Sequence, residues 1–257
     1  MFLEILYNSF FDEERLRDKL AKKRKYKEFL KTYQNPSNII DKNTKIFWNS
    51  FTVTYKETLL NSPVYQDKIN RTVNFLENKT GNILDIGFGI GEIERRLQTS
   101  ELKIYGIDIS SVAVKNAKKE LKGTYKIGSI FKIPYTTKSM DFVLALDVLE
   151  HIPVNKTFNV YKGISRILKT KGMLIISVPI NENLEELYIE NNNPNNHLRV
   201  YTPDIIKTEL ILNGFKIVKT NYLYAFGKFY FLKSVFINFF KLNIRKPNLM
   251  IIFCQKQ

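Results

Sequence analysis

Cysteine is nearly absent from this sequence of 257 residues, which contains Cys254 and no second cysteine. An internal disulfide framework and a zinc site built on several cysteines are therefore excluded. No run reaches the roughly 18 consecutive apolar residues that a helix needs to span a bilayer. The opening apolar run is short and is followed, not preceded, by charge, so we expect no secretory signal. These absences favour a reducing, cytoplasmic compartment.

Acidic residues are also scarce, with 25 Asp and Glu against 40 Lys and Arg, which gives a formal net charge of +15. One interpretation is an anionic partner such as RNA or a membrane surface. The other is a general enrichment in Lys, Asn and Ile without functional meaning. Both stay open, because net charge alone does not identify a partner.

Apolar runs alternate with amphipathic stretches between residues 81 and 180. Strands are expected at 82–87, 103–110, 123–130, 140–147 and 172–179, and helices at 111–121 and 155–169. Nearly all-apolar strands that alternate with helices indicate a parallel sheet covered on both faces. Later segments predict a helix at 202–215, which starts beside Pro203 and ends at Gly214, and strands at 215–226 and 248–256.

The first 80 residues lack this alternation. Amphipathic patterns there predict helices at 11–33, 44–60 and 67–78. We therefore expect a helical extension over residues 1–80, which forms a lid on an α/β domain at 81–257.

A glycine-rich turn follows the first strand, in the stretch ILDIGFGIGEIERRL at 83–97. Bare backbone there lets a ligand approach closely and aims N–H groups at it. Dinucleotide-binding folds have a similar turn. Asp85 puts negative charge beside the turn, which suits a cationic amine or sulfonium and not a pyrophosphate. Asp108, at the end of the second strand, can bind ribose hydroxyls in either class of ligand and does not discriminate between them.

Five segments occur in register: LDIGFGIGE, YGIDIS, GSIFKIPY, MDFVLALDVLEHIP and LKTKGMLIISVP. Together they resemble the class I S-adenosylmethionine (SAM) dependent methyltransferases, especially the small-molecule branch that includes the ubiquinone-biosynthesis O-methyltransferases. The resemblance covers about residues 80–220. It implies a Rossmann-like seven-stranded α/β sheet, SAM as the cofactor and S-adenosylhomocysteine (SAH) as its product.

The resemblance also implies which residues hold SAM. The methionine part would lie against Asp85, Gly87, Gly89, Leu146 and Asp147. The adenosine would lie against Asp108, Ile109, Ser129 and Ile130. The apolar members of this set would look the same as plain core residues. Two positions depart from the family pattern, since Ser129 stands where an acidic residue is common and Phe88 where a small residue or cysteine is common.

The acceptor side rests on two histidines, and we expect no metal. His151 follows the fourth strand, at the end of the sheet where such folds bind ligands. His197 lies in a loop beyond the fifth strand. His197 is the candidate base for an oxygen or nitrogen acceptor, and His151 is a second candidate. The alternatives are an ordinary loop histidine at 197 and a structural histidine at 151.

The segment 226–246 forms an aromatic and basic insertion between the two last strands. Lys233, Asn238, Lys241 and Arg245 recur at roughly helical spacing among mostly apolar residues. Such a helix is typical of contact with a membrane surface or a lipophilic acceptor. It could instead pack on the N-terminal helices or in a homodimer interface.

The sequence thus predicts a methyltransferase for a small, lipophilic acceptor, methylated at oxygen or nitrogen, in the cytoplasm with peripheral membrane contact through 226–246. Two alternatives remain. One is a tRNA methyltransferase, supported by net charge alone and opposed by the lack of an appended RNA-binding module. The other is a SAM-binding partner subunit without turnover.

Overall fold

The computed structural model describes residues 41–182, 195–226, 229–240 and 246–257. The helix predicted at 11–33 lies outside these residues. So do Lys241 and Arg245 of the predicted basic stripe.

Within the described residues, the strands form one seven-stranded sheet in the order β3-β2-β1-β4-β5-β7-β6. The first five strands in this order are parallel, and β7 runs antiparallel between β5 and β6. The strand bounds are β1 Gly81–Ile86, β2 Leu102–Asp108, β3 Thr124–Ile127, β4 Met140–Leu146, β5 Leu168–Pro179, β6 Phe215–Leu223 and β7 Leu249–Lys256. The predicted parallel sheet is confirmed. The predicted third strand ends early, at Ile127, so that Ser129 and Ile130 lie in the turn beyond it.

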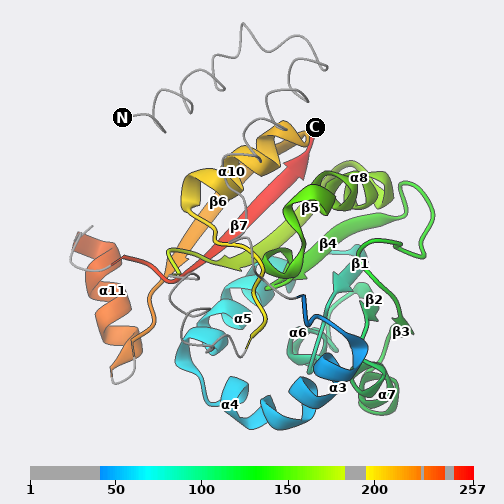
Figure 1. Cartoon of the computed structure of the whole chain (residues 1–257), viewed down its shortest axis with the longest axis horizontal. Helices are drawn as coiled ribbons and strands as arrows, with labels where there is room; N and C mark the ends of the chain where they lie inside the picture. Colours follow the sequence, from blue (N-terminus) through cyan, green and yellow to red (C-terminus); the bar gives the residue numbers. More distant parts are fainter. Residues whose placement is uncertain (1–40, 183–194, 227–228, 241–245) are drawn as a thin grey trace, which may run out of the picture.

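Helices cover both faces of the sheet (Figure 1). Their bounds are α3 Lys45–Thr54, α4 Lys56–Leu60, α5 Pro63–Leu76, α6 Glu92–Arg96, α7 Ser111–Glu120, α8 Thr157–Ile167, α10 Pro203–Leu212 and α11 Tyr230–Phe240. Apolar side chains of α8 and α10 fill one core cluster, and those of α5, α6 and α7 fill the other. Strand residues alternate between the two clusters, because successive side chains point to opposite faces. In β1, for example, Leu84 and Ile86 join the first cluster and Ile83 joins the second.

Helix starts follow their capping residues. Ser62 accepts a hydrogen bond from the N–H of Tyr65 ahead of α5, and Thr202 does the same for Ile205 ahead of α10. Each helix has proline in its first turn, where no N–H partner is needed. The segment predicted as one helix at 44–60 is instead broken at Tyr55 into α3 and α4.

The expected helix inside 226–246 is present as α11, which stands at one edge of the molecule (Figure 1). Its described contact with the body includes the Tyr230 hydroxyl, which donates to Asp67 of α5 at 2.9 Å. None of the helices in the described ranges is long and apolar enough to cross a membrane.

Candidate functional site

A cavity of about 620 Å³ opens at the carboxyl ends of β1, β2 and β4. Open α/β sheets bind ligands at this edge. Every residue that the sequence singles out lines the cavity: Asp85, Gly87, Gly89, Asp108, Ile109, Ser129, Ile130, Leu146, Asp147, His151 and His197. Residues of α3 and α5 complete its wall, including Trp48, Phe51, Tyr65 and Lys68.

The glycine turn presents bare backbone to the cavity. Gly87 and Gly89 have φ angles of 75° and 57°, in the left-handed region that favours glycine. A Cβ atom on Gly87 would meet the Cγ2 atom of Val148 at 2.8 Å, whereas one on Gly89 would project into open space. The Phe88 side chain turns away into the core, where its ring lies 5.3 Å from that of Tyr125. The larger residue at position 88 is therefore accommodated by packing.

The side chain of Asp108, at the end of β2, is hydrogen-bonded to the glycine turn. Its Oδ2 atom accepts the N–H of Gly89 at 2.9 Å, and its Oδ1 atom accepts the N–H of Ser110 at 2.7 Å. Burial raises the pKa of Asp108, and these backbone N–H groups oppose that shift. Each carboxylate oxygen keeps a second lone pair for a ligand hydroxyl.

Asp85 is almost fully buried, and its Oδ1 atom receives no hydrogen bond from any described residue. Burial raises its pKa to about 6. A buried carboxylate with few hydrogen-bond donors favours a cationic ligand, because the positive charge offsets the cost of removing the carboxylate from water.

Asp147 follows β4 in a left-handed conformation, with a φ angle of 53°. It pairs with Lys68 of α5 and accepts a hydrogen bond from the Ser177 hydroxyl. Burial raises the pKa of Asp147, but Lys68 and Ser177 outweigh it and hold that pKa below its usual value. Asp147 is therefore ionised and, unlike Asp85, already paired with a lysine.

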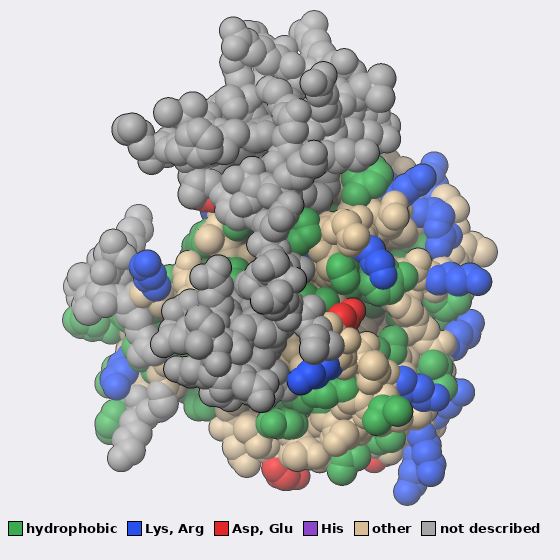
Figure 2. All heavy atoms as spheres, in the orientation of Figure 1, with side chains coloured by type: hydrophobic (Ala, Val, Ile, Leu, Met, Phe, Trp, Pro, Cys, Tyr) green, Lys and Arg blue, Asp and Glu red, His purple; other side chains and the backbone are tan. Residues whose placement is uncertain are grey.

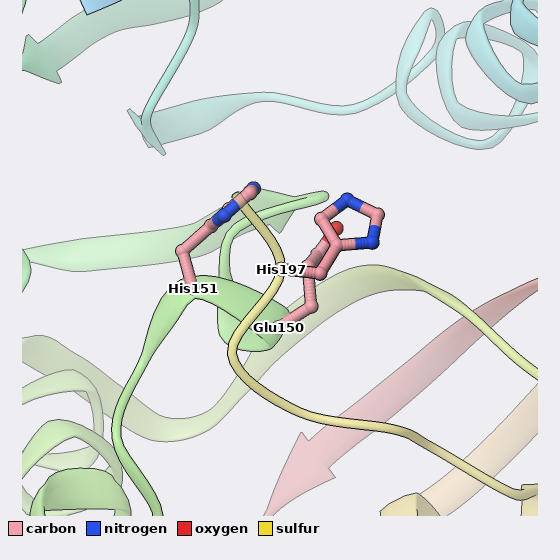
Figure 3. A group of neighbouring side chains, drawn as sticks. All are labelled: Glu150, His151 and His197. Carbon is pink, nitrogen blue, oxygen red and sulfur yellow. The ribbon is translucent and has the colours of Figure 1, made fainter. Parts of the chain in front are cut away.

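The two histidines meet at one end of the cavity, with ring centroids 5.1 Å apart. His151 donates from Nδ1 to the Asn196 carbonyl at 3.2 Å, and His197 donates from Nδ1 to Glu182 at 2.8 Å. Burial lowers the pKa of His151 to about 3, so its ring is neutral. Figure 3 shows Glu150 and His151 on the turn after β4, with His197 facing them from a separate loop.

Comparisons with known proteins agree with this geometry. Residues 84–176 match a family model described as a methyltransferase domain. An uncharacterized protein of Methanocaldococcus jannaschii is 31% identical over 173 residues, which are 66% of this chain and 68% of that protein. The magnesium protoporphyrin IX methyltransferase of Synechocystis, solved with bound SAH, has a TM-score of 0.61 at 18% identity, over 83% of this chain and 98% of that one. A SAM-dependent methyltransferase of Archaeoglobus fulgidus has a TM-score of 0.59 at 18% identity, over 82% and 98%.

This chain belongs to the class I SAM-dependent methyltransferases. It is a methyltransferase, and its cofactor is SAM. The cavity of this methyltransferase suits such a ligand, since its volume of about 620 Å³ lies within the usual range for cofactor sites. The donor-poor carboxylate of Asp85 and the open space at Gly89 add charge and room for a cationic ligand.

The histidine end of the methyltransferase also has the donor set of a metal site. Glu150, His151 and His197 each offer a ligand atom, and these atoms lie within 4.8 Å of one another. Imidazole and carboxylate together suit several divalent transition metals. We expected no metal from the sequence, in which Glu150 and His151 are neighbours but His197 lies far along the chain.

Sequence reasoning missed several residues of the cavity wall. Lys68 and Trp48 lie in helices whose amphipathic pattern predicted packing alone. Glu94 and Glu150 lie close to predicted site residues and are fully buried, which the sequence does not signal for a glutamate. The sequence did offer one indication for Glu182: it lies three residues after the fifth strand, at the edge of the sheet where such folds bind ligands.

Proposed function

We propose that this methyltransferase transfers the methyl group of SAM to an oxygen or nitrogen atom of a small, lipophilic acceptor. The observation that carries the proposal is one continuous cavity, lined by Asp85 and Asp108 at the ends of β1 and β2 and by His151 and His197 beyond β4 and β5. Its wall also includes apolar side chains of distant elements, among them Phe51, Leu59 and Ile152. Such a wall favours an apolar acceptor, because moving apolar surface out of water into this cavity is favourable.

In this proposal SAM supplies an electrophilic methyl group on a sulfonium centre. Asp85 pairs with the amino group of its methionine part, beside Gly87, Gly89, Leu146 and Asp147. Asp108 accepts the ribose hydroxyls, and Ile109, Ser129 and Ile130 enclose the adenine. Residues 1–80 act as a lid. A contact of α3 supports this: Oδ1 of Asn49 accepts a hydrogen bond from the Ser110 hydroxyl at 3.0 Å, two residues beyond Asp108.

His197 serves as the base in this proposal. Because Nδ1 donates to Glu182 at 2.8 Å, Nε2 is the ring atom that would take a proton from the acceptor. A carboxylate that orients a histidine in this way also stabilises the charge that the ring gains. His197 therefore accepts the proton of an acceptor hydroxyl or amine as the methyl group is transferred.

Kinetics of two variants test this role. His197→Ala should lower turnover by roughly 10²-fold or more while SAM affinity stays within about twofold. Glu182→Gln should cause a smaller loss, and the double variant should be no slower than His197→Ala, because the two residues act as a unit. Equal losses of SAM affinity and turnover in His197→Ala would place the histidine on the cofactor side instead.

The acceptor reaches the cavity from a membrane surface in this proposal. Among the described side chains of α11, the exposed apolar residues are Phe231, Leu232, Val235 and Phe236, and a few apolar side chains are visible at this edge in Figure 2. Soluble proteins seldom expose so continuous an apolar patch without a function. Ala225 and Asn248, which flank the segment that contains α11, line the cavity.

Liposome sedimentation tests this contact. The protein should bind anionic vesicles in a salt-sensitive manner, since its net charge is +15. Leu232→Gln with Val235→Gln should weaken binding, whereas Val218→Gln, at an exposed apolar position of β6, should not. Unchanged binding in the double variant would remove α11 as the contact. A water-soluble acceptor would then be the better hypothesis.

A further inference from the structure

Two buried carboxyl groups meet on the wall of the cavity, Asp85 at the end of β1 and Glu94 in α6. Their residues are 4% and 2% exposed. The Oδ1 atom of Asp85 and the Oε2 atom of Glu94 are fully buried, and neither receives a hydrogen bond from another described residue. The two side chains are near enough to hydrogen-bond to each other. One proton between them would therefore satisfy both orphaned oxygens.

We propose that Glu94 is a positioning residue for SAM: as a neutral acid it donates a hydrogen bond to Asp85, which keeps that carboxylate ionised and aimed at the cavity. Glu94 holds the shared proton because burial, and then the charge of Asp85, raise its pKa well above the usual value. Asp85 is the more acidic member, since the hydrogen bond from Glu94 opposes the effect of its burial. The inference rests on the proposed contact between Asp85 and the amino group of SAM.

The surrounding charges support this division of roles. Asp108, at the end of β2, raises the pKa of both carboxyl groups, and Lys68 of α5 lowers that of Asp85. Lys68 is also paired with Asp147. Tyr65 of α5 and Tyr125 of β3 face the pair as neutral phenols, since burial raises their pKa.

Glu92 of α6, which also lines the cavity, is bound to Arg96 at 2.8 Å. With one proton shared between them, Asp85 and Glu94 together carry one negative charge, which matches the single positive charge of the amino group of SAM. Two carboxylates would instead leave an uncompensated charge in a buried site.

Calorimetric titration of two ligands across pH 5–9 tests the proposal. SAH carries the amino group, and 5′-methylthioadenosine shares its adenosine part but lacks that group. For the wild type and for Glu94→Gln, which keeps a donor, SAH affinity should fall only as the pH drops through about 6, the pKa of Asp85. In Glu94→Leu, SAH affinity should be lower by roughly tenfold at pH 7.5, and its loss on acidification should begin at a higher pH. Methylthioadenosine affinity should be the same in all three proteins.

A measurement on the wild type does not depend on how the variants fold. Titration of SAH at pH 7.5 in buffers of different ionisation enthalpy should show almost no proton release, because Glu94 keeps its proton. Release of one proton per SAH, or a wild-type pH profile in Glu94→Leu, would overturn the proposal. If neither ligand binds the wild type at any pH, the proposed cofactor site itself is wrong. If both ligands bind the wild type and Glu94→Leu has the same affinities and pH profile as the wild type, only the proposed role of Glu94 is wrong.

Discussion

Replacement of Asp108 by asparagine should weaken cofactor binding more than any other single change of similar size. Asp108 is 7% exposed, and its carboxylate accepts hydrogen bonds from the N–H groups of Gly89 and Ser110. In the proposed complex it also accepts two ribose hydroxyls. Asparagine keeps one oxygen acceptor but loses the charge, which should cost about 2–3 kcal/mol of binding free energy. The Kd for SAH should therefore rise by roughly 30- to 140-fold.

A matched control separates this effect from damage to the fold. Asp141 also accepts a backbone N–H, from Asn82 at 2.8 Å, but it lies at the start of β4, at the opposite edge of the sheet. Asp141→Asn is therefore the control. In Asp108→Asn and in Asp141→Asn alike, a backbone N–H loses its charged acceptor, so the free energy of unfolding should fall by about 1–3 kcal/mol in each. Calorimetry should find weaker SAH binding in Asp108→Asn alone. Equal affinities in the two folded variants would refute the ribose contact.

Two further predictions concern the histidine end of the cavity. Glu150 is fully buried without hydrogen-bond donors among the described residues, and burial raises its pKa well above the usual value. Above about pH 4.3 the unfolded chain releases a proton that the folded protein keeps, so Glu150 makes stability fall as the pH rises. Glu150→Gln should thus raise the free energy of unfolding by about 1–3 kcal/mol at pH 7.5 and by less at pH 5, measured by urea denaturation. Equal stability of the two proteins at both pH values would contradict this. Separately, methyl transfer should persist in a chelator, because His197 acts as a base in the proposed reaction. Loss of activity that a divalent cation restores would show that Glu150, His151 and His197 hold a metal.

The sequence predicts the central sheet well because its signal is local. Short apolar runs such as 140–147, which alternate with amphipathic stretches, favour strands buried on both faces, and the turn after β1 needs glycine at positions 87 and 89. The order of the strands and the antiparallel direction of β7 were not predicted, because neither follows from local periodicity; the family resemblance supplied only the number of strands. The end of β3 at Ile127 was missed, since the apolar residue Ile130 continues the pattern into the turn.

The site is less predictable because it forms only when side chains from separate parts of the sequence come together in the folded chain. Asp85 and Asp108 are visible in the sequence because each closes a strand beside the glycine turn. Glu94 lies only nine residues beyond Asp85, yet nothing local shows that α6 folds it back against that carboxylate. Glu182 becomes the partner of His197 only when the loop beyond β5 returns to the cavity.

Transfer of a labelled methyl group from SAM tests the central claim most directly. The purified protein is incubated with labelled SAM and, separately, with the small-molecule, lipid and RNA fractions of its source cell. We expect label in an apolar small molecule or lipid, a loss of roughly 10²-fold or more with His197→Ala, and little transfer with Asp108→Asn at low SAM concentration. Label in RNA alone, or SAM binding without transfer to any fraction, would contradict it.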